Sequence, residues 1–300
     1  MLCRNLLLAT FLTAAATGSP LTNEESSAAE KSCDELFRES ESLWLEHDYN
    51  GSDKALELAR KKCPDRAEVL WRTARNEYDR IERIPRDRKP PKEELVKRYK
   101  KVEKLADKCI QLDQKDGNCW LWKAVGIGRR SSTQGMLAAI PMVDDMERTL
   151  LKALELKPGY RAIDGTANST ADLNSMLGIF YRVLPEWTCT FPFNEILGTC
   201  GDLDKSIEFH RKAVEMEPGR LEYHKELAIS LLCRGQKRGR PQEIEEGKKI
   251  LRELQSLPEI KATDGIDKEH SMMLIEDPSL ACGYSRDAQQ EQSKEAFEMR

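Results

Sequence analysis

The sequence lacks the short motifs that mark most catalytic and metal sites. It contains no HExxH, CxxC or GxSxG pattern, no phosphate-binding loop and no dinucleotide fingerprint, and it has four histidines in 300 residues. Its GxG, Gly126–Gly128, follows a tryptophan-rich segment and not a strand, which favours close helix packing over nucleotide binding. We therefore expect no catalytic residue, no metal ligand and no cofactor, and we predict that the chain is not an enzyme.

The chain also has no excess charge of one sign and no long apolar run after its N-terminus. Charged residues make up 33% of the sequence and hydrophobic residues 39%, with a formal net charge of −4. No uniform positive field attracts nucleic acid, because the basic run Arg86–Lys104 is interrupted by glutamates. A membrane-spanning helix needs about 20 mostly apolar residues, so we expect no integral membrane span.

The N-terminal residues have the pattern of a secretory signal peptide. Arg4 precedes the apolar segment Leu6–Ala16, and small residues follow it. We expect residues 1–18 to be the signal, cut after Ala16 or Gly18, which predicts a periplasmic or secreted protein. The alternative is a retained membrane anchor.

The use of cysteine is consistent with export. The chain has nine cysteines, and loss of Cys3 with the signal leaves an even number. The expected helices bring the others together as four sequential pairs, Cys33 with Cys63, Cys109 with Cys119, Cys189 with Cys200, and Cys233 with Cys282. The alternative is that they are buried free thiols in a reducing compartment.

Apolar residues recur at spacings of three and four, and no stretch alternates with period two, so we expect an all-α fold. The clearest example is Gly201–Pro218 followed by Leu221–Gly235, two amphipathic helices separated by a Pro-Gly break. Further helices are expected at Ser32–Asp48, Ser52–Lys62, a segment capped by Asp65, Lys92–Leu112, Asn118–Arg130, Met142–Leu156, Thr170–Leu184 and Pro241–Leu257. Asn50-Gly51 predicts a turn, and a solvated tail is expected from about Tyr284.

The two helices of Gly201–Gly235 resemble the tetratricopeptide repeat, a two-helix unit of about 34 residues. The residues that carry the resemblance are Gly201-Asp202, Ser206, His210, Ala213 and Pro218, then His224, Leu227 and Ala228, and earlier Leu177-Gly178 with Tyr181. The segment YRVLPEW, with GDLDKSIEFHRKAVEMEPGR after it, is also similar to the regulators of microtubule dynamics and to exported bacterial helical-repeat proteins. The resemblance implies a right-handed α-solenoid of about five hairpins over residues 32–258, with a flexible lead-in at 19–31 and a cap and tail at 259–300.

The resemblance also implies a concave groove lined by the first helix of each hairpin. The residues expected to line it are Arg72, Arg75, Lys123, Ser175, Ile179, Arg182, Lys225 and Ile229. Such a cationic groove suits an acidic peptide or a chain-terminal carboxylate. A second candidate surface is an aromatic lip of Trp187, Phe191 and Phe193, with packing over the solenoid as the alternative.

Two histidines, His210 and His224, lie on the facing stripes of adjacent expected helices. One interpretation is that they form a metal pair or a pH-sensitive contact. The other is that they replace aromatic residues of the core, and their helical spacing favours this second interpretation.

These features predict an exported, non-enzymatic scaffold that binds a protein or peptide partner and no nucleic acid. Two alternatives stay open. One is a microtubule-associated regulator retained at a membrane. The other is a carrier of a lipid or small molecule, for which Gly126, Gly128 and the break at 131–141 are the sequence indications of a cavity.

Overall fold

The computed structural model describes residues 31–135, 139–261, 263–284 and 286. The expected signal peptide, and the expected lead-in up to residue 30, lie outside the described residues. The described helices belong to a unit that begins at Cys33. As predicted from the helical periodicity, the described residues contain helices and no strand.

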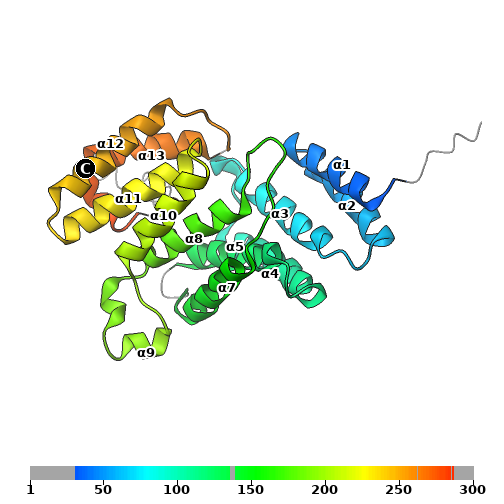
Figure 1. Cartoon of the computed structure of the whole chain (residues 1–300), viewed down its shortest axis with the longest axis horizontal. Helices are drawn as coiled ribbons and strands as arrows, with labels where there is room; N and C mark the ends of the chain where they lie inside the picture. Colours follow the sequence, from blue (N-terminus) through cyan, green and yellow to red (C-terminus); the bar gives the residue numbers. More distant parts are fainter. Residues whose placement is uncertain (1–30, 136–138, 262, 285, 287–300) are drawn as a thin grey trace, which may run out of the picture. The chain divides into compact units, whose positions relative to one another are not determined.

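Within the described residues, the long helices pair into successive hairpins (Figure 1). The pairs are Cys33–Leu45 (α1) with Tyr49–Lys62 (α2), Glu68–Glu82 (α3) with Lys92–Leu112 (α4), Gly117–Gln134 (α5) with Val143–Leu156 (α7), Ser169–Val183 (α8) with Leu203–Met216 (α10), and Leu221–Lys237 (α11) with Pro241–Glu253 (α12). A last helix, Asp264–Glu276 (α13), and a 3-10 turn, Pro278–Ala281 (η5), contact α11. Shorter 3-10 turns lie at Arg86–Arg88 (η1), Ile140–Met142 (η2) and Leu254–Ser256 (η4). Tyr284 is 2% exposed, so the expected solvated tail does not begin there.

Neighbouring hairpins are stacked by recurring contacts. Each second helix contacts the first helix of the next pair, and the first helices contact one another, α3 with α5, α5 with α8, α8 with α11 and α11 with α13. This repeated contact pattern is that of an α-solenoid, in which every unit buries its apolar face against its neighbours. The predicted fold class is therefore confirmed.

Helix α10 shows how the sequence specifies one of these units. The Asp202 side chain accepts hydrogen bonds from two backbone N–H groups of the first turn, which would otherwise lack partners. The buried face of the helix repeats every three or four residues and consists of Leu203, Ser206, Ile207, His210 and Ala213. This stripe faces α8 and α11, the two helices that α10 contacts.

Two glycines of α5 lie where helices approach closely. A β-carbon on Gly126 would be 2.9 Å from the backbone nitrogen of Glu103 in α4, and one on Gly128 would be 3.2 Å from Met146 of α7. The predicted close helix packing is confirmed. Because neighbouring helices fill the space at both glycines, these residues give no sign of a ligand cavity.

Two local expectations in the first hairpins are wrong. Asn50-Gly51 does not form a turn, because Asp48 begins a helix there by accepting a hydrogen bond from the Gly51 N–H. Asp65 does not cap α3, whose preceding residue is Ala67 and whose first turn has no side-chain cap.

The structure places the cysteines of the four expected pairs next to each other. The Cα atoms are 6.4 Å apart in Cys33–Cys63, 5.4 Å in Cys109–Cys119, 4.9 Å in Cys189–Cys200 and 4.6 Å in Cys233–Cys282. These distances lie within the range of about 4.4–6.8 Å that a disulfide requires. Oxidation of these pairs in the protein itself stays a prediction.

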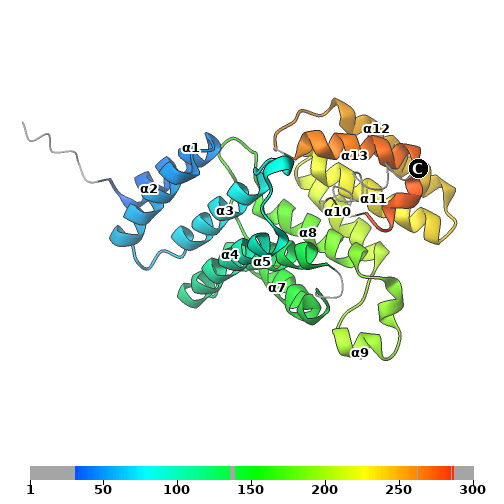
Figure 2. The same cartoon turned by 180° about the vertical axis from the view of Figure 1, so that it is seen from behind.

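Two connections leave the stack of hairpins. Residues 157–168, between α7 and α8, return to α1 and α3, where Tyr160 lies 4.9 Å from the ring of Trp71 (Figure 1). The insertion between α8 and α10 contains Glu186–Cys189 (η3) and Phe193–Leu197 (α9), and α9 projects away from the hairpins in both views (Figures 1 and 2). Among the described helices, none combines the length and the low polarity needed to cross a membrane.

Candidate functional site

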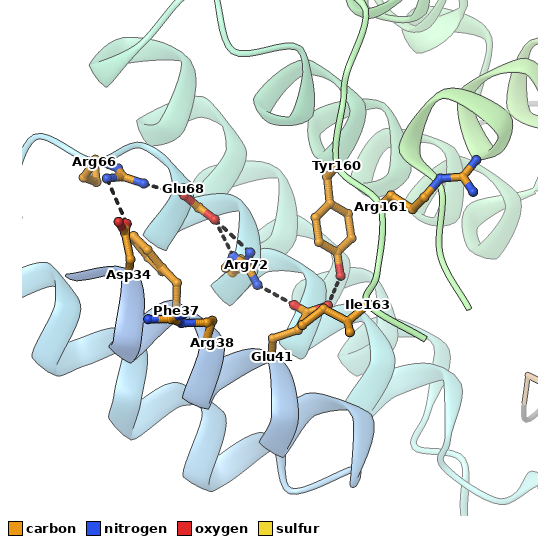
Figure 3. A pocket seen from close by; sticks show the side chains of 10 residues that line it. All are labelled: Asp34, Phe37, Arg38, Glu41, Arg66, Glu68, Arg72, Tyr160, Arg161 and Ile163. Atoms are coloured by element: carbon orange, nitrogen blue, oxygen red, sulfur yellow. Dashed lines mark hydrogen bonds and ion pairs between the residues drawn. The ribbon is translucent and has the colours of Figure 1, made fainter. Parts of the chain in front are cut away.

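A pocket of about 270 Å³ opens where the connection between α7 and α8 meets α1 and α3. It is lined from α1 by Asp34, Phe37, Arg38 and Glu41, from α3 and the residues before it by Arg66, Glu68 and Arg72, and from the connection by Tyr160, Arg161 and Ile163 (Figure 3). The lining has four arginines and three carboxylates, so it carries one positive charge more than negative when all are ionised.

The floor of this pocket is a closed network around Glu41. Its carboxylate accepts hydrogen bonds from Arg72 and from the hydroxyl of Tyr160, and it lies 3.0 Å from Nη1 of Arg75. Arg75 also lies over the ring of Trp44, at 3.8 Å from the ring centre, which is cation–π geometry. Both guanidinium groups thus have partners within the chain.

The charge state of the floor follows from these contacts. Burial by itself raises the pKa of Glu41, but Arg75, the Tyr160 hydrogen bond and Arg72 outweigh burial and hold the pKa below its usual value. Burial raises the pKa of Tyr160, and Glu41 adds to this effect against the opposing Arg75 and Arg72. At neutral pH the carboxylate is therefore ionised and the hydroxyl keeps the proton that it donates.

The rim of the pocket is open by comparison. Arg38 is exposed and makes no hydrogen bond or ion pair with another described residue. Ile163, which also lines the pocket, is 77% exposed, and the guanidinium of Arg66 lies over the ring of Phe37 at 5.1 Å. The rim thus combines an unpaired cation with apolar surface.

The structure corrects the predicted cationic groove. Arg72 and Arg75 lie in the paired floor described above, and Arg182 and Lys225 are 5% and 0% exposed. Arg182 pairs with Glu226 at 2.7 Å and Lys225 with Asp267 at 2.6 Å. The remaining predicted residues are buried Ser175 and Ile229, half-buried Ile179, and half-buried Lys123, which lies 3.3 Å from Asp107. Because the chain's own carboxylates neutralise these cations, they do not form a free acidic-peptide groove in this structure.

The aromatic insertion is exposed where its side chains are described. Trp187 is 55% exposed, Phe191 76% and Ile196 68%. Phe193 begins α9, and its side chain lies outside the described part of the chain. The exposure favours the lip over packing on the solenoid, and a binding role for it stays a prediction.

The two histidines lie in different environments. His210 is fully buried against Gly178, which confirms the core interpretation for this residue. His224 is half-buried and its Nε2 is 2.7 Å from the carbonyl oxygen of Pro218, so the core interpretation is wrong for it. Among the described residues, three side chains that can bind metal lie close together: Cys109, Asp116 and Cys119. Its two sulfurs form one of the cysteine pairs and its carboxylate caps α5, so these groups already have partners.

Of the ten residues that line the pocket, only Arg72 was among the site residues predicted from the sequence. Glu41, Tyr160, Arg161 and Ile163 lie on segments that are far apart in the chain, and no local spacing links them. The one available signal was the sequence KPGY at Lys157–Tyr160, where the repeat-like ending carries a large aromatic just after the helix.

Comparison with known proteins agrees with this architecture. Residues 31–163 match the family model described as regulator of microtubule dynamics protein 1-3, and this range contains all the residues that line the pocket. A thermophilic TPR protein of Thermus thermophilus is 14% identical, covers 81% of this chain and 100% of its own, and superposes with a TM-score of 0.52. This chain has a tetratricopeptide-like fold.

Other solved structures are less similar to this tetratricopeptide-like chain. YrrB, described as a TPR protein with an unusual peptide-binding site, is 11% identical, with 81% and 93% of the two chains covered and a TM-score of 0.40. Residues 41 to the end of MamA from Desulfovibrio magneticus RS-1 are 15% identical, with 76% and 97% covered and a TM-score of 0.40. No curated protein sequence matches the chain.

Proposed function

We propose that the protein is a non-enzymatic scaffold that binds a segment of a protein partner in the pocket between α1, α3 and the 160–163 connection. The observation that carries this proposal is the contrast between the floor and the rim. Every charge of the floor is paired within the chain. By contrast, Arg38 is exposed and has no partner among the described residues, and Ile163, which also lines the pocket, is exposed.

The chemistry of the rim defines the segment that fits. An unpaired guanidinium favours a carboxylate, and forms with it the stronger, charge-assisted kind of hydrogen bond. Ile163, which is 77% exposed, offers apolar surface for a neighbouring side chain of the same segment. The expected ligand is therefore a short segment with Asp or Glu next to Leu, Ile or Phe.

A panel of labelled synthetic peptides tests this proposal by fluorescence polarisation. Peptides that pair an acidic with an apolar residue should bind, and peptides of matched length with the acid amidated should not. The variant Arg38→Glu should weaken binding by about tenfold or more, which is about 1.4 kcal/mol. Arg60→Glu, exposed on α2 outside the pocket, is the matched control. Equal binding by both variants, or no binding by any peptide, contradicts the proposal.

We also propose that the protein is exported. The signal-like N-terminus and the spacing of the cysteine pairs support this location, since disulfides persist in oxidising compartments.

A second candidate function is binding to microtubules, supported by the family description matched at residues 31–163. Co-sedimentation of the full chain with polymerised tubulin, with and without reductant, tests it. Pelleting that saturates with tubulin concentration supports this function, and a chain that stays in the supernatant under both conditions excludes it.

A further inference from the structure

Two asparagines of the chain begin the pattern Asn-X-Ser/Thr, in Asn50-Gly51-Ser52 and Asn168-Ser169-Thr170. This pattern is the acceptor for N-linked glycans in proteins that enter a secretory pathway. A glycan is a bulky, solvated group, so the folded protein tolerates it only at a surface position. The structure gives the two asparagines opposite surroundings, and this difference separates an acceptor from a chance match.

Asn168 is part of the packed structure. It is 9% exposed, and its Oδ1 accepts hydrogen bonds from the backbone N–H groups of Thr170 and Ala171, which caps α8. Its amide nitrogen, the atom to which a glycan is attached, donates to Glu217 at 2.7 Å. The hydroxyl of Thr170 donates to the carbonyl oxygen of Pro158. A sugar on this amide nitrogen is incompatible with these contacts.

Asn50 lies on an open surface. It is exposed in the first turn of α2, and its side chain makes no hydrogen bond with another described residue. The residues on the same face of the helix are all exposed, namely Lys54, Glu57, Leu58 and Lys61. The residues that line the pocket at α1 and α3 include none from α2. A glycan on Asn50 therefore extends into solvent from a face that does not line the pocket.

The hydroxyl that completes this acceptor pattern is buried in the folded chain. Ser52 is 0% exposed, and its Oγ lies 2.9 Å from the carbonyl oxygen and 2.8 Å from the Oγ of Ser40 in α1. The pattern requires this hydroxyl, so an enzyme that reads it has no access after α1 and α2 have paired. Modification of Asn50 thus has to precede that pairing.

We infer that Asn50 is the N-glycan acceptor of this chain, that it is modified before α1 pairs with α2, and that Asn168 carries no glycan in the exported protein. The inference rests on the proposed export. The co-substrate is a lipid-linked oligosaccharide pyrophosphate. The Asn50 amide nitrogen loses a proton and bonds to the anomeric carbon of the sugar, while the bond from that carbon to the phosphate breaks and the lipid pyrophosphate leaves.

Secretion of the full chain from a cultured eukaryotic cell tests the site. The intact mass of the secreted protein should show one glycan, which a peptide N-glycosidase removes, and peptide mapping should place it on Asn50. Asn50→Gln should abolish this added mass. Asn194→Gln, which changes an exposed asparagine of α9 outside any acceptor pattern, is the matched control and should keep it. Arg38→Glu should also keep it, which separates this inference from the proposed pocket.

The order of the two events is tested with the solubilised glycosyltransferase and its lipid-linked sugar donor. A synthetic peptide of residues 47–55 should accept a glycan, and the same peptide with Ser52→Ala should not. The full chain made in bacteria, folded and free of glycan, should accept none, because Ser52 is then buried. After urea unfolding and dilution into the assay, the same chain should become an acceptor while it is still unfolded.

Four outcomes overturn the inference. A secreted chain without a glycan contradicts it and leaves the proposed export intact. A secreted chain with a glycan on Asn168 contradicts the choice between the two sites. A folded chain that accepts a glycan as readily as the peptide contradicts the proposed order. A chain that stays in the cell, keeps residues 1–18 and has no glycan contradicts the export and this inference together, and its mass distinguishes that case from the first.

Discussion

His210 is buried between α8 and α10, and among the described residues neither of its ring nitrogens has a hydrogen-bond partner. Burial, opposed by Glu226 and reinforced by Arg182 and Lys225, lowers the pKa of His210 to about 3. In the unfolded chain the pKa is about 6.5. The unfolded state therefore takes up a proton between these two values that the folded state does not, and stability is lost as the pH falls through this window.

His210→Leu tests that assignment. For the wild type, this one group lowers the free energy of unfolding by up to about 1.4 kcal/mol for each pH unit below about 6.5. Urea unfolding at about pH 7.5 and about pH 5 should show a smaller difference between the two conditions in the variant. His224→Leu, at the half-buried position, should keep the wild-type difference. An unchanged pH dependence in His210→Leu would contradict the assignment.

Glu41 also has a lowered folded-state pKa, but the cause differs: Arg75, Tyr160 and Arg72 stabilise its charged form and outweigh the effect of burial. Glu41→Gln leaves two buried guanidinium groups without their counter-charge and should cost about 3 kcal/mol at neutral pH. The carboxylate stabilises the fold above its ordinary pKa and loses this effect as the pH falls through the lowered value. Chemical unfolding should therefore show the two proteins converging in acid. Glu57→Gln, an exposed ion-pair position on α2, should cost less than about 1 kcal/mol.

Among the elements, the insertion between α8 and α10 depends on one close approach. A β-carbon on Gly201 would collide with the backbone carbonyl of Leu184. Because the colliding atom belongs to the backbone, rotation of a side chain cannot relieve the clash. Gly201→Ala should therefore lower the free energy of unfolding by about 1–3 kcal/mol, as overpacking does. Gly219→Ala, where a β-carbon meets no atom within 4 Å, is the matched control and should be nearly neutral. Thermal unfolding of both variants measures the difference, and equal midpoints would contradict the proposed contact.

Element bounds were predictable to different degrees. Helix α4, Lys92–Leu112, begins and ends where the sequence predicts, because a proline precedes it and its apolar stripe is continuous. The expected turn at Asn50-Gly51 was wrong because two local signals compete there, and the cap made by Asp48 lies one residue before the helix. The turn preference of Asn-Gly takes no account of a helix cap at Asp48, two residues earlier.

For the whole molecule, the state of the cysteines is the decisive prediction. Intact mass of the protein from its native source, alkylated before and after reduction, should show no free thiol before reduction and the loss of residues 1–16 or 1–18. Peptide mapping without reduction should recover the four pairs named above. A full-length chain with alkylatable thiols would contradict both export and oxidation. Each pair lost should lower stability by about 2–4 kcal/mol.

The sequence by itself determined the all-α class, the succession of hairpins and which cysteines lie next to each other in the structure, since helical periodicity, proline breaks and the ends of adjacent helices are local properties. It also indicated which cations lie on the first helices. Only the tertiary structure decided what those cations contact. Arg72 and Arg75 meet Glu41 and Tyr160, and Arg182 meets Glu226 and the Tyr284 carbonyl. Pairing of charges depends on distances between segments that are far apart in the chain, and no residue spacing encodes those distances.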